Sequence, residues 1–168
     1  SPELNNRRDI SVYLPRSYRR TEHSYPVIYM HDGQNLFDPA TSFAGEWGVD
    51  QAMARAGHRG RRAIVVAIPN MGVDRLREYS PFVDARAGGG GGDAYVDFIL
   101  RTVKPMIDAQ YRTYAGREGT GIVGSSMGGL VFGIAHTAVN PPAAAARAPE
   151  RIVSLCSCPG SRRWTCRS

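Results

Sequence analysis

Long hydrophobic runs are missing from this sequence of 168 residues. Because it contains no stretch of about 18 apolar residues, we expect no transmembrane helix and no membrane partner. The first residues, SPELNNRRDI, are polar and lack the apolar segment of a signal peptide, which favours a cytoplasmic location. The chain begins with Ser1 rather than Met, so a processed protein and a fragment both stay open. The length and a 42% hydrophobic content predict one globular domain.

Lysine and cysteine are scarce. Lys104 is the only lysine, and the three cysteines, Cys156, Cys158 and Cys166, all lie near the C-terminus. An odd count with C-x-C spacing fits neither a disulfide framework nor a tetrahedral zinc set, so we expect no metal and no cofactor. Residues 143–168 hold five arginines against one glutamate, whereas the other 142 residues hold 16 basic and 14 acidic groups. Since the net charge of +6 belongs mostly to this segment, we expect no nucleic-acid partner.

Short apolar runs alternate with helical stretches along the chain. The runs predict strands at residues 11–14, 27–30, 63–68, 121–125 and 152–156. The inner runs are apolar on both faces, which is typical of parallel strands covered by helices. The alternation predicts an α/β fold with a mostly parallel sheet.

Two helices are predicted between these strands. The first spans residues 49–56, and Gly57 is expected to follow its last turn. Asp93 is expected to cap the second. Its apolar face is formed by Val96, Ile99, Leu100, Val103, Met106 and Ile107. Pro105 should kink or divide this helix.

Glycine-rich segments raise two further possibilities. The five glycines Gly88–Gly92 predict a mobile surface loop, since a phosphate-binding P-loop needs a Gly-Lys-Ser/Thr ending. Residues 119–124 fit G-x-G-x-x-G, but these glycines precede and enter a strand, whereas a dinucleotide-binding turn follows one. We therefore favour neither a phosphate site nor a dinucleotide site here.

A serine motif follows the fourth predicted strand. Residues 124–128, GSSMG, match G-x-S-x-G, and a helix-compatible stretch, 129–139, comes next. This strand–turn–helix context is that of a nucleophile elbow, in which Ser126 stands on a sharp turn that only glycine neighbours allow. The N-terminus of the helix then faces a developing oxyanion, to which the Met127 N–H can donate.

The loop after the second predicted strand is placed to supply another oxyanion donor. In the sequence HDGQN, Gly33 permits close backbone approach, and the Gln34 N–H is the preferred donor. We interpret His31 as a structural histidine, because a base before the serine contradicts the Ser…Asp/Glu…His chain order. His31 and Asp32 also lack further metal ligands at a familiar spacing.

Several segments resemble the putative-esterase family of α/β hydrolases, which includes enterochelin-esterase-like and esterase-D-like enzymes. HDGQNLFD at residues 31–38 and GSSMGG at residues 124–129 are the most specific matches. Other matching segments bring the resemblance to residues 8 to about 130, in the order of the family. The resemblance implies a three-layer α/β-hydrolase-type sandwich. It also implies a serine esterase that acts on small acyl esters through an acyl-Ser126 intermediate.

The resemblance implies roles for individual residues as well. Ser126 matches the nucleophile, and Met127 and the Gly33–Gln34 loop match the oxyanion-hole positions. Trp47 and the segment Asn70–Tyr79 resemble pocket-lining, substrate-binding loops, with core or loop packing as the alternative.

Two charged residues of that segment, Arg75 and Glu78, are expected to pair on the loop. Such a pair would be either structural or substrate-binding. A small-molecule ester is the partner that the resemblance implies, while the oligomeric state stays open.

Acids and histidines are scarce after the serine. A Ser-His-Asp mechanism needs a base and an orienting carboxylate, which follow the nucleophile in this fold. The 42 residues after Ser126 contain one histidine, His136, one acid, Glu150, and no Asp. A helix places His136 roughly 15 Å from Ser126 along its axis, out of reach. We therefore expect that the family's C-terminal strands and its acid and base are missing, and that this chain is inactive or nearly so.

The C-terminal segment also changes in composition. From about Val131 the family pattern fades into a tail, residues 131–168, rich in Ala, Pro, Arg and Cys. We interpret the chain as one partial domain, 1–168, that is truncated or frameshifted in this tail, with a divergent loop in a genuine short protein as the alternative. A non-catalytic ligand-binding or scaffold module that keeps the front half of the fold is the rival to the esterase hypothesis.

Overall fold

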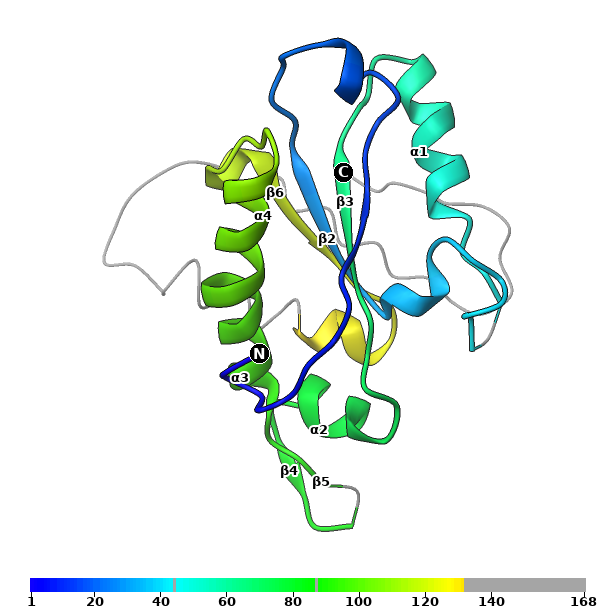
Figure 1. Ribbon diagram of the computed structural model, residues 1–168. Coiled ribbons are helices and arrows are strands. Elements are labelled where there is room, and N and C mark those ends of the chain that lie inside the picture. Colours follow the sequence, from blue (N-terminus) through cyan, green and yellow to red (C-terminus); the bar gives the residue numbers. More distant parts are fainter. Residues whose placement is uncertain (44, 87, 132–168) are drawn as a thin grey trace.

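A four-stranded sheet forms the centre of the protein (Figure 1). The computed structural model describes residues 1–43, 45–86 and 88–131. The strands are β1 (Ser11–Tyr13), β2 (Val27–His31), β3 (Ile64–Ile68) and β6 (Thr120–Val123). Their order is β1-β3-β2-β6, with β2 parallel to β3 and β6, and β1 antiparallel to β3. These elements confirm the four strands predicted in this part of the chain, with small shifts at their ends.

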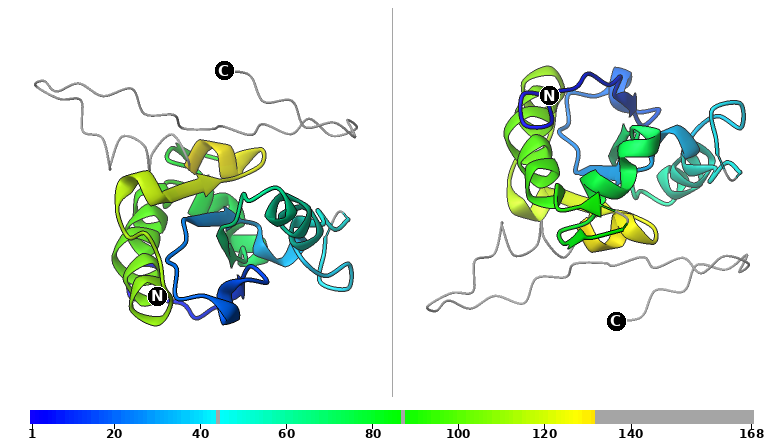
Figure 2. Two further views of the ribbon diagram at one scale, coloured as in Figure 1. Left: turned by 90° about the horizontal axis from the view of Figure 1, so that it is seen from above. Right: turned by 90° about the horizontal axis from the view of Figure 1, so that it is seen from below.

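Helices cover both faces of the sheet and complete the three layers of an α/β sandwich (Figure 2). One face carries α3 (Gly92–Asp97), the π-helical turn Phe98–Val103 and α4 (Lys104–Gln110) as one continuous helical stretch. The other face carries α1 (Val49–His58). All five residues of β3 are buried, as expected for a parallel strand between two helical layers.

Alternation along β3 divides the apolar core between the two faces. Ile64, Val66 and Ile68 pack toward α3 and α4, whereas Val65 and Ala67 pack toward α1. Full burial of one Val or Ile side chain stabilises a fold by about 1.5–3 kcal/mol. The strand that leads into the loops of the candidate site is therefore anchored from both sides.

The long helix differs from its prediction at its start and in its middle. Gly91 rather than Asp93 is the N-cap residue, and Asp93 lies in the first turn. The helix continues through Pro105, and a π-helical turn at Phe98–Val103 precedes the proline. The proline ring removes the N–H that would bind the Arg101 carbonyl in an α-helix. A wider turn at this point accommodates the missing donor.

Glycines account for two further differences from the predictions. Gly88–Gly89 forms β5, which pairs antiparallel with β4 (Val83–Asp84) in a hairpin, and Gly92 begins α3, so the glycine run is not the continuous surface loop predicted. A Cβ at Gly89 would overlap the carbonyl oxygen of Phe82, so this close pairing requires glycine. Gly57 lies inside α1 rather than after its last turn.

Short helical turns occupy the connections around the sheet. After β2 comes η2 (Gly33–Asn35), and after β3 come η3 (Gly72–Asp74) and α2 (Arg75–Tyr79). The turns η1 (Tyr18–Arg20) and η5 (Arg117–Gly119) precede β2 and β6. Gly119 thus lies before β6 and Gly121 within it, as the sequence predicts for the G-x-G-x-x-G match.

Several predictions concern parts of the chain outside this description. The strand predicted at residues 152–156, the three cysteines and His136 lie outside the described residues, as does all of the tail except Val131. Within the described ranges, no helix is long and apolar enough to cross a membrane.

Candidate active site

The serine of the GSSMG motif stands on a sharp turn between β6 and a helical segment. β6 ends at Val123, and residues 127–131 are helical, so the helix begins two residues before Gly129. Ser126 is exposed and has a φ of 55°, in the left-handed region. A non-glycine residue held there costs about 1–3 kcal/mol and persists only where its surroundings fix it. This conformation is characteristic of a nucleophile elbow.

Glycines on both sides of the serine make the turn possible. A Cβ at Gly124 would overlap the carbonyl group of Gly128 and lie 2.6 Å from His31 Cδ2. A Cβ at Gly128 would lie 3.3 Å from His31 Cβ, whereas the nearest atom to a Cβ at Gly129 is 4.0 Å away. The requirement for glycine is therefore strict at position 124, moderate at 128 and weak at 129.

The loop after β2 leaves the sheet beside the serine turn. Met30 of β2 is paired with Val123 of β6 in a parallel ladder, so both strands end at the same edge of the sheet. Figure 1 shows η2 and the helical segment after β6 at this end. A Cβ at Gly33 would lie 2.6 Å from the backbone carbonyl carbon of Ala67, so glycine is needed where this loop packs against β3.

The two predicted oxyanion donors make no hydrogen bond with the described residues. Neither the Gln34 N–H nor the Met127 N–H donates a hydrogen bond to another described residue. Met127 is the first residue of its helical segment, where N–H groups have no partner within the helix. Among the described residues, both amide groups are therefore free to donate to a bound acceptor.

The Asp32 carboxylate anchors the loop after β2. Arg75 Nε and Nη2 donate to its two oxygens at 2.7 and 2.8 Å, and Asn70 Nδ2 donates to Oδ1 at 2.7 Å. The Asp32 N–H donates to the Tyr79 hydroxyl at 3.2 Å, and Asp32 has a φ of 55°. Its side chain is only 4% exposed, so these bonds are shielded from water. The hydrogen bond to Asp32 raises the pKa of the Arg75 guanidinium.

The predicted pair of Arg75 with Glu78 is wrong. Arg75 binds Asp32 instead, while the Glu78 carboxylate accepts from Arg8 at 2.6 Å, with both side chains at most 2% exposed. Asn6 Nδ2 also donates to Glu78, at 3.0 Å. The helix α2 is thus connected to the candidate site by one charged residue and to the N-terminal segment by another.

His31 is packed beneath the serine turn. It is fully buried, and its Nδ1 lies 3.1 Å from the Tyr95 hydroxyl. Its Nε2 is buried without a hydrogen-bond partner among the described residues. Burial lowers the pKa of this imidazole to about 4, so the ring is neutral at pH 7. The geometry agrees with the interpretation of His31 as a structural residue.

The two residues predicted to bind substrate make contacts within the protein. Trp47 is half-buried against the core on the α1 side, and its backbone N–H donates to the Asn35 carbonyl at 2.8 Å. Asn70 binds Asp32 through its side-chain amide, and its backbone N–H donates to Gln34 Oε1 at 3.2 Å. Asn70 therefore helps to hold the loop after β2. Direct contact with a substrate stays a prediction for both residues.

Two tyrosines are buried beneath the site, which the sequence analysis did not predict for either of them. The rings of Tyr79 and Tyr95 each have centroids 5.5 Å from the His31 ring, and they lie 4.9 Å from each other. Burial raises the pKa of both phenols, so they act as neutral hydrogen-bonding groups. Tyr95 lies one turn before Ile99 on the apolar helix face, a signal that could have indicated its burial.

Comparison with known proteins identifies the family. The family described as Putative esterase matches residues 1–140. This chain belongs to that family. A solved IroE-like serine hydrolase from Shewanella oneidensis is 27% identical, with a TM-score of 0.66 over 84% of this chain and 45% of its own. The likeness confirms the predicted α/β-hydrolase-type fold.

Curated relatives are longer than this chain. The uncharacterized protein YbbA of Bacillus subtilis is 28% identical over 132 residues, which are 75% of this chain and 49% of that protein. The siderophore triacetylfusarinine C esterase of Aspergillus fumigatus is 36% identical over 115 residues, or 63% of this chain and 37% of its own length. The chain thus spans half or less of the length of these relatives.

Proposed function

We propose that this chain supplies the nucleophile and the oxyanion hole of a carboxylic-ester hydrolase, with Ser126 as the nucleophile. The conformation of Ser126 carries the proposal, because an exposed serine with a φ of 55° stands between a parallel strand and the start of a helix. In such a turn the hydroxyl oxygen is clear of the strand and the helix, and a substrate carbonyl can approach it.

The proposed reaction proceeds through an acyl-enzyme. Ser126 Oγ loses its proton to a base and attacks the carbonyl carbon, which places the negative charge on the carbonyl oxygen. Collapse of this intermediate breaks the bond to the alcohol, which takes up the proton and leaves an ester on Ser126. Water then attacks the acyl-serine, releasing the carboxylic acid and restoring the hydroxyl.

The unengaged N–H groups of Gln34 and Met127 are the proposed donors to the oxyanion. The bonds from Arg75 and Asn70 to Asp32 hold the loop that carries Gln34, so the donor is fixed before the reaction begins. Removal of one such donor in a serine hydrolase lowers kcat by roughly 10²–10³. Preorganisation of this loop is therefore a substantial part of the proposed catalytic power.

The general base is the part of the mechanism for which the described residues offer no candidate. His31 is buried, neutral at pH 7 and engaged with Tyr95. The sequence contains no Asp after Ser126. We therefore propose that the 168-residue chain alone hydrolyses esters slowly. The oxyanion hole and substrate binding would supply at most ~10³–10⁴-fold over water.

A small-molecule ester is the proposed substrate. The relative from A. fumigatus is named for the hydrolysis of a siderophore ester, and the relative from S. oneidensis is described as a serine hydrolase. Trp47 and Asn70 are proposed to line the substrate site. Asn70 also helps to position Gln34, because its backbone N–H donates to the side-chain oxygen of Gln34.

Acylation by p-nitrophenyl acetate tests this function. The protein is incubated with the ester, digested and analysed by peptide mass spectrometry. We expect an acetyl group on Ser126 in the wild-type chain and in Ser125→Ala, and none in Ser126→Ala. Saturable binding of the ester with no acetylation of Ser126 would overturn the proposal in favour of a non-catalytic ligand-binding or scaffold module.

A further inference from the structure

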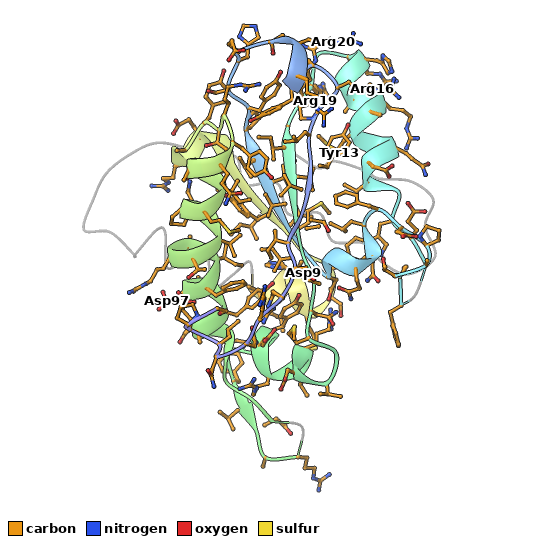
Figure 3. All side chains as sticks on the ribbon, viewed as in Figure 1. Asp9, Tyr13, Arg16, Arg19, Arg20 and Asp97 are labelled. Carbon is orange, nitrogen blue, oxygen red and sulfur yellow. The ribbon has the colours of Figure 1, made fainter. Side chains whose placement is uncertain are left out.

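A cavity of about 210 Å³ lies far from Ser126, between the turn after β1 and the C-terminal end of α1. Its walls include Tyr13, Arg16, Arg20, Met53, His58 and Arg62. Arg20 precedes β2 and Arg62 precedes β3, so the cavity is at the amino ends of the parallel strands. Figure 3 shows Tyr13, Arg16 and Arg20 at this end, beside α1.

The side chains that line the cavity include several basic groups and no carboxylate. Three arginines and one histidine line it, and its lining contains no Asp or Glu. None of Arg16, Arg20 and Arg62 makes an ion pair or side-chain hydrogen bond with another described residue. All three arginines are exposed. Unpaired guanidinium groups around one hollow repel each other, and a bound anion would remove this repulsion.

Helix capping does not explain this arrangement. Cationic side chains are favourable near the C-terminus of a helix, where they can bind the last carbonyls. In α1, however, the carbonyl of Ala56 accepts the backbone N–H groups of Arg59 and Arg61, and the carbonyl of Gly57 accepts that of Gly60. The acidic residue of α1, Asp50, is at its other end, roughly 12 Å from His58 along the helix axis, although it is close enough to Tyr13 to add, after burial, to the raised pKa of that phenol.

We propose that this cavity binds a small organic anion that carries a phosphate-like group on a flat apolar body. Guanidinium groups bind phosphate oxygens in paired hydrogen bonds, which suits Arg16, Arg20 and Arg62. The Tyr13 ring and Met53 offer an apolar wall for the remainder of the ligand. The volume is below the ~300–1,000 Å³ of sites for drug-sized ligands, so the ligand is small. This inference is independent of the function proposed for Ser126.

Titration with phenylphosphonate tests the proposal, because this probe has the dianion and the ring but no hydrolysable ester. Binding is followed by calorimetry and by chemical-shift changes. We expect saturable binding in the millimolar range or tighter. Arg16→Gln and Arg62→Gln should each weaken it by roughly tenfold. Benzyl alcohol, which has the ring without the charge, should not bind at these residues.

Arg86→Gln is the matched control, because Arg86 is an exposed arginine between β4 and β5 that does not line the cavity. This variant should bind phenylphosphonate as the wild type does, and thermal melting should show that all three variants are folded. Equal weakening in the control, or no weakening at Arg16 and Arg62, would overturn the proposal. Arginine-dependent binding to phosphatidate vesicles without binding of phenylphosphonate would also overturn it, because the arginines would then bind a lipid surface and not a small anion.

Discussion

Arg75 donates to both carboxylate oxygens of Asp32, the residue at which the chain turns from β2 into the loop that carries Gln34. The two residues are 43 positions apart in sequence, and their pair joins α2 to the loop of the proposed oxyanion hole. Because the Asp32 side chain is only 4% exposed, its negative charge is stabilised by hydrogen bonds from these partners and little by water. The pair therefore connects the stability of the fold to the geometry of the site.

Replacement of Arg75 should lower the stability of the fold and disturb the geometry of the candidate site. Arg75→Lys keeps the charge but cannot reach both oxygens of Asp32 in the planar, two-bond geometry of a guanidinium. An unsatisfied buried acceptor costs about 1–3 kcal/mol, so we expect a loss of this size in the free energy of unfolding, measured with urea. Acetylation of Ser126 should also slow in this variant.

The control for this variant is Arg77→Lys. Arg77 pairs with Asp74 in the same region, but the two side chains are 55% and 46% exposed. Its replacement should change the free energy of unfolding by no more than about 0.5 kcal/mol. Equal losses in the two variants would contradict a special role for Arg75.

Gly124→Ala should disrupt the serine turn, whereas Gly129→Ala should not. A Cβ at Gly124 would overlap Gly128 and approach His31 Cδ2 to 2.6 Å, while at Gly129 the nearest atom is 4.0 Å away. Overpacking of this kind costs about 1–3 kcal/mol. We expect a lower melting temperature and no acetylation of Ser126 in Gly124→Ala only. Normal acetylation in that variant would show that the turn is not shaped as described.

The buried imidazole of His31 should make stability depend on pH. Its pKa is lowered to about 4, compared with an ordinary value near 6.5, because burial disfavours the charged ring. The unfolded chain therefore binds the proton more readily than the folded one between these values. The contribution of His31 to the free energy of unfolding is therefore fully present above pH ~6.5. It is lost as the pH falls, by up to ~1.4 kcal/mol per pH unit and ~3 kcal/mol in total.

Urea unfolding of the wild type and of His31→Gln between about pH 7 and 4.5 measures this effect. The variant has no imidazole at this position, so its stability should fall less steeply as pH decreases. The comparison of the two slopes removes the contribution of other titrating groups, which both proteins share. Identical slopes would mean that His31 has an ordinary pKa in the folded protein.

The sequence predicted the elements whose signals are local. Apolar runs located the strands β1, β2, β3 and β6, and the spacing of the GSSMG motif placed Ser126 between a strand and a helix. The need for glycine at position 33 agrees with the structure, since a Cβ there would meet the backbone of Ala67, while the role of Gly33 in an oxyanion loop stays a prediction.

The remaining features depend on partners that are distant in the chain. Arg75 was assigned to Glu78, three residues away, but its partner is Asp32 on another loop. Glu78 binds Arg8, 70 positions away. The capping of the long helix by Gly91 and the hairpin built from Gly88–Gly89 were also missed, because backbone geometry rather than side-chain type determines both. No periodicity in the sequence encodes such pairings.

The pH dependence of fluorophosphonate labelling at Ser126 tests the central claim most directly. The probe forms a bond between phosphorus and the serine oxygen and expels fluoride, so mass spectrometry locates it. If Ser126 is a nucleophile without a histidine base, labelling should be slow and confined to Ser126, present in Ser125→Ala and absent in Ser126→Ala. Its rate should rise about tenfold per pH unit with no inflection near pH ~6.5, the ordinary pKa of histidine. No labelling of Ser126 at any pH, or an inflection near that value, would contradict the account.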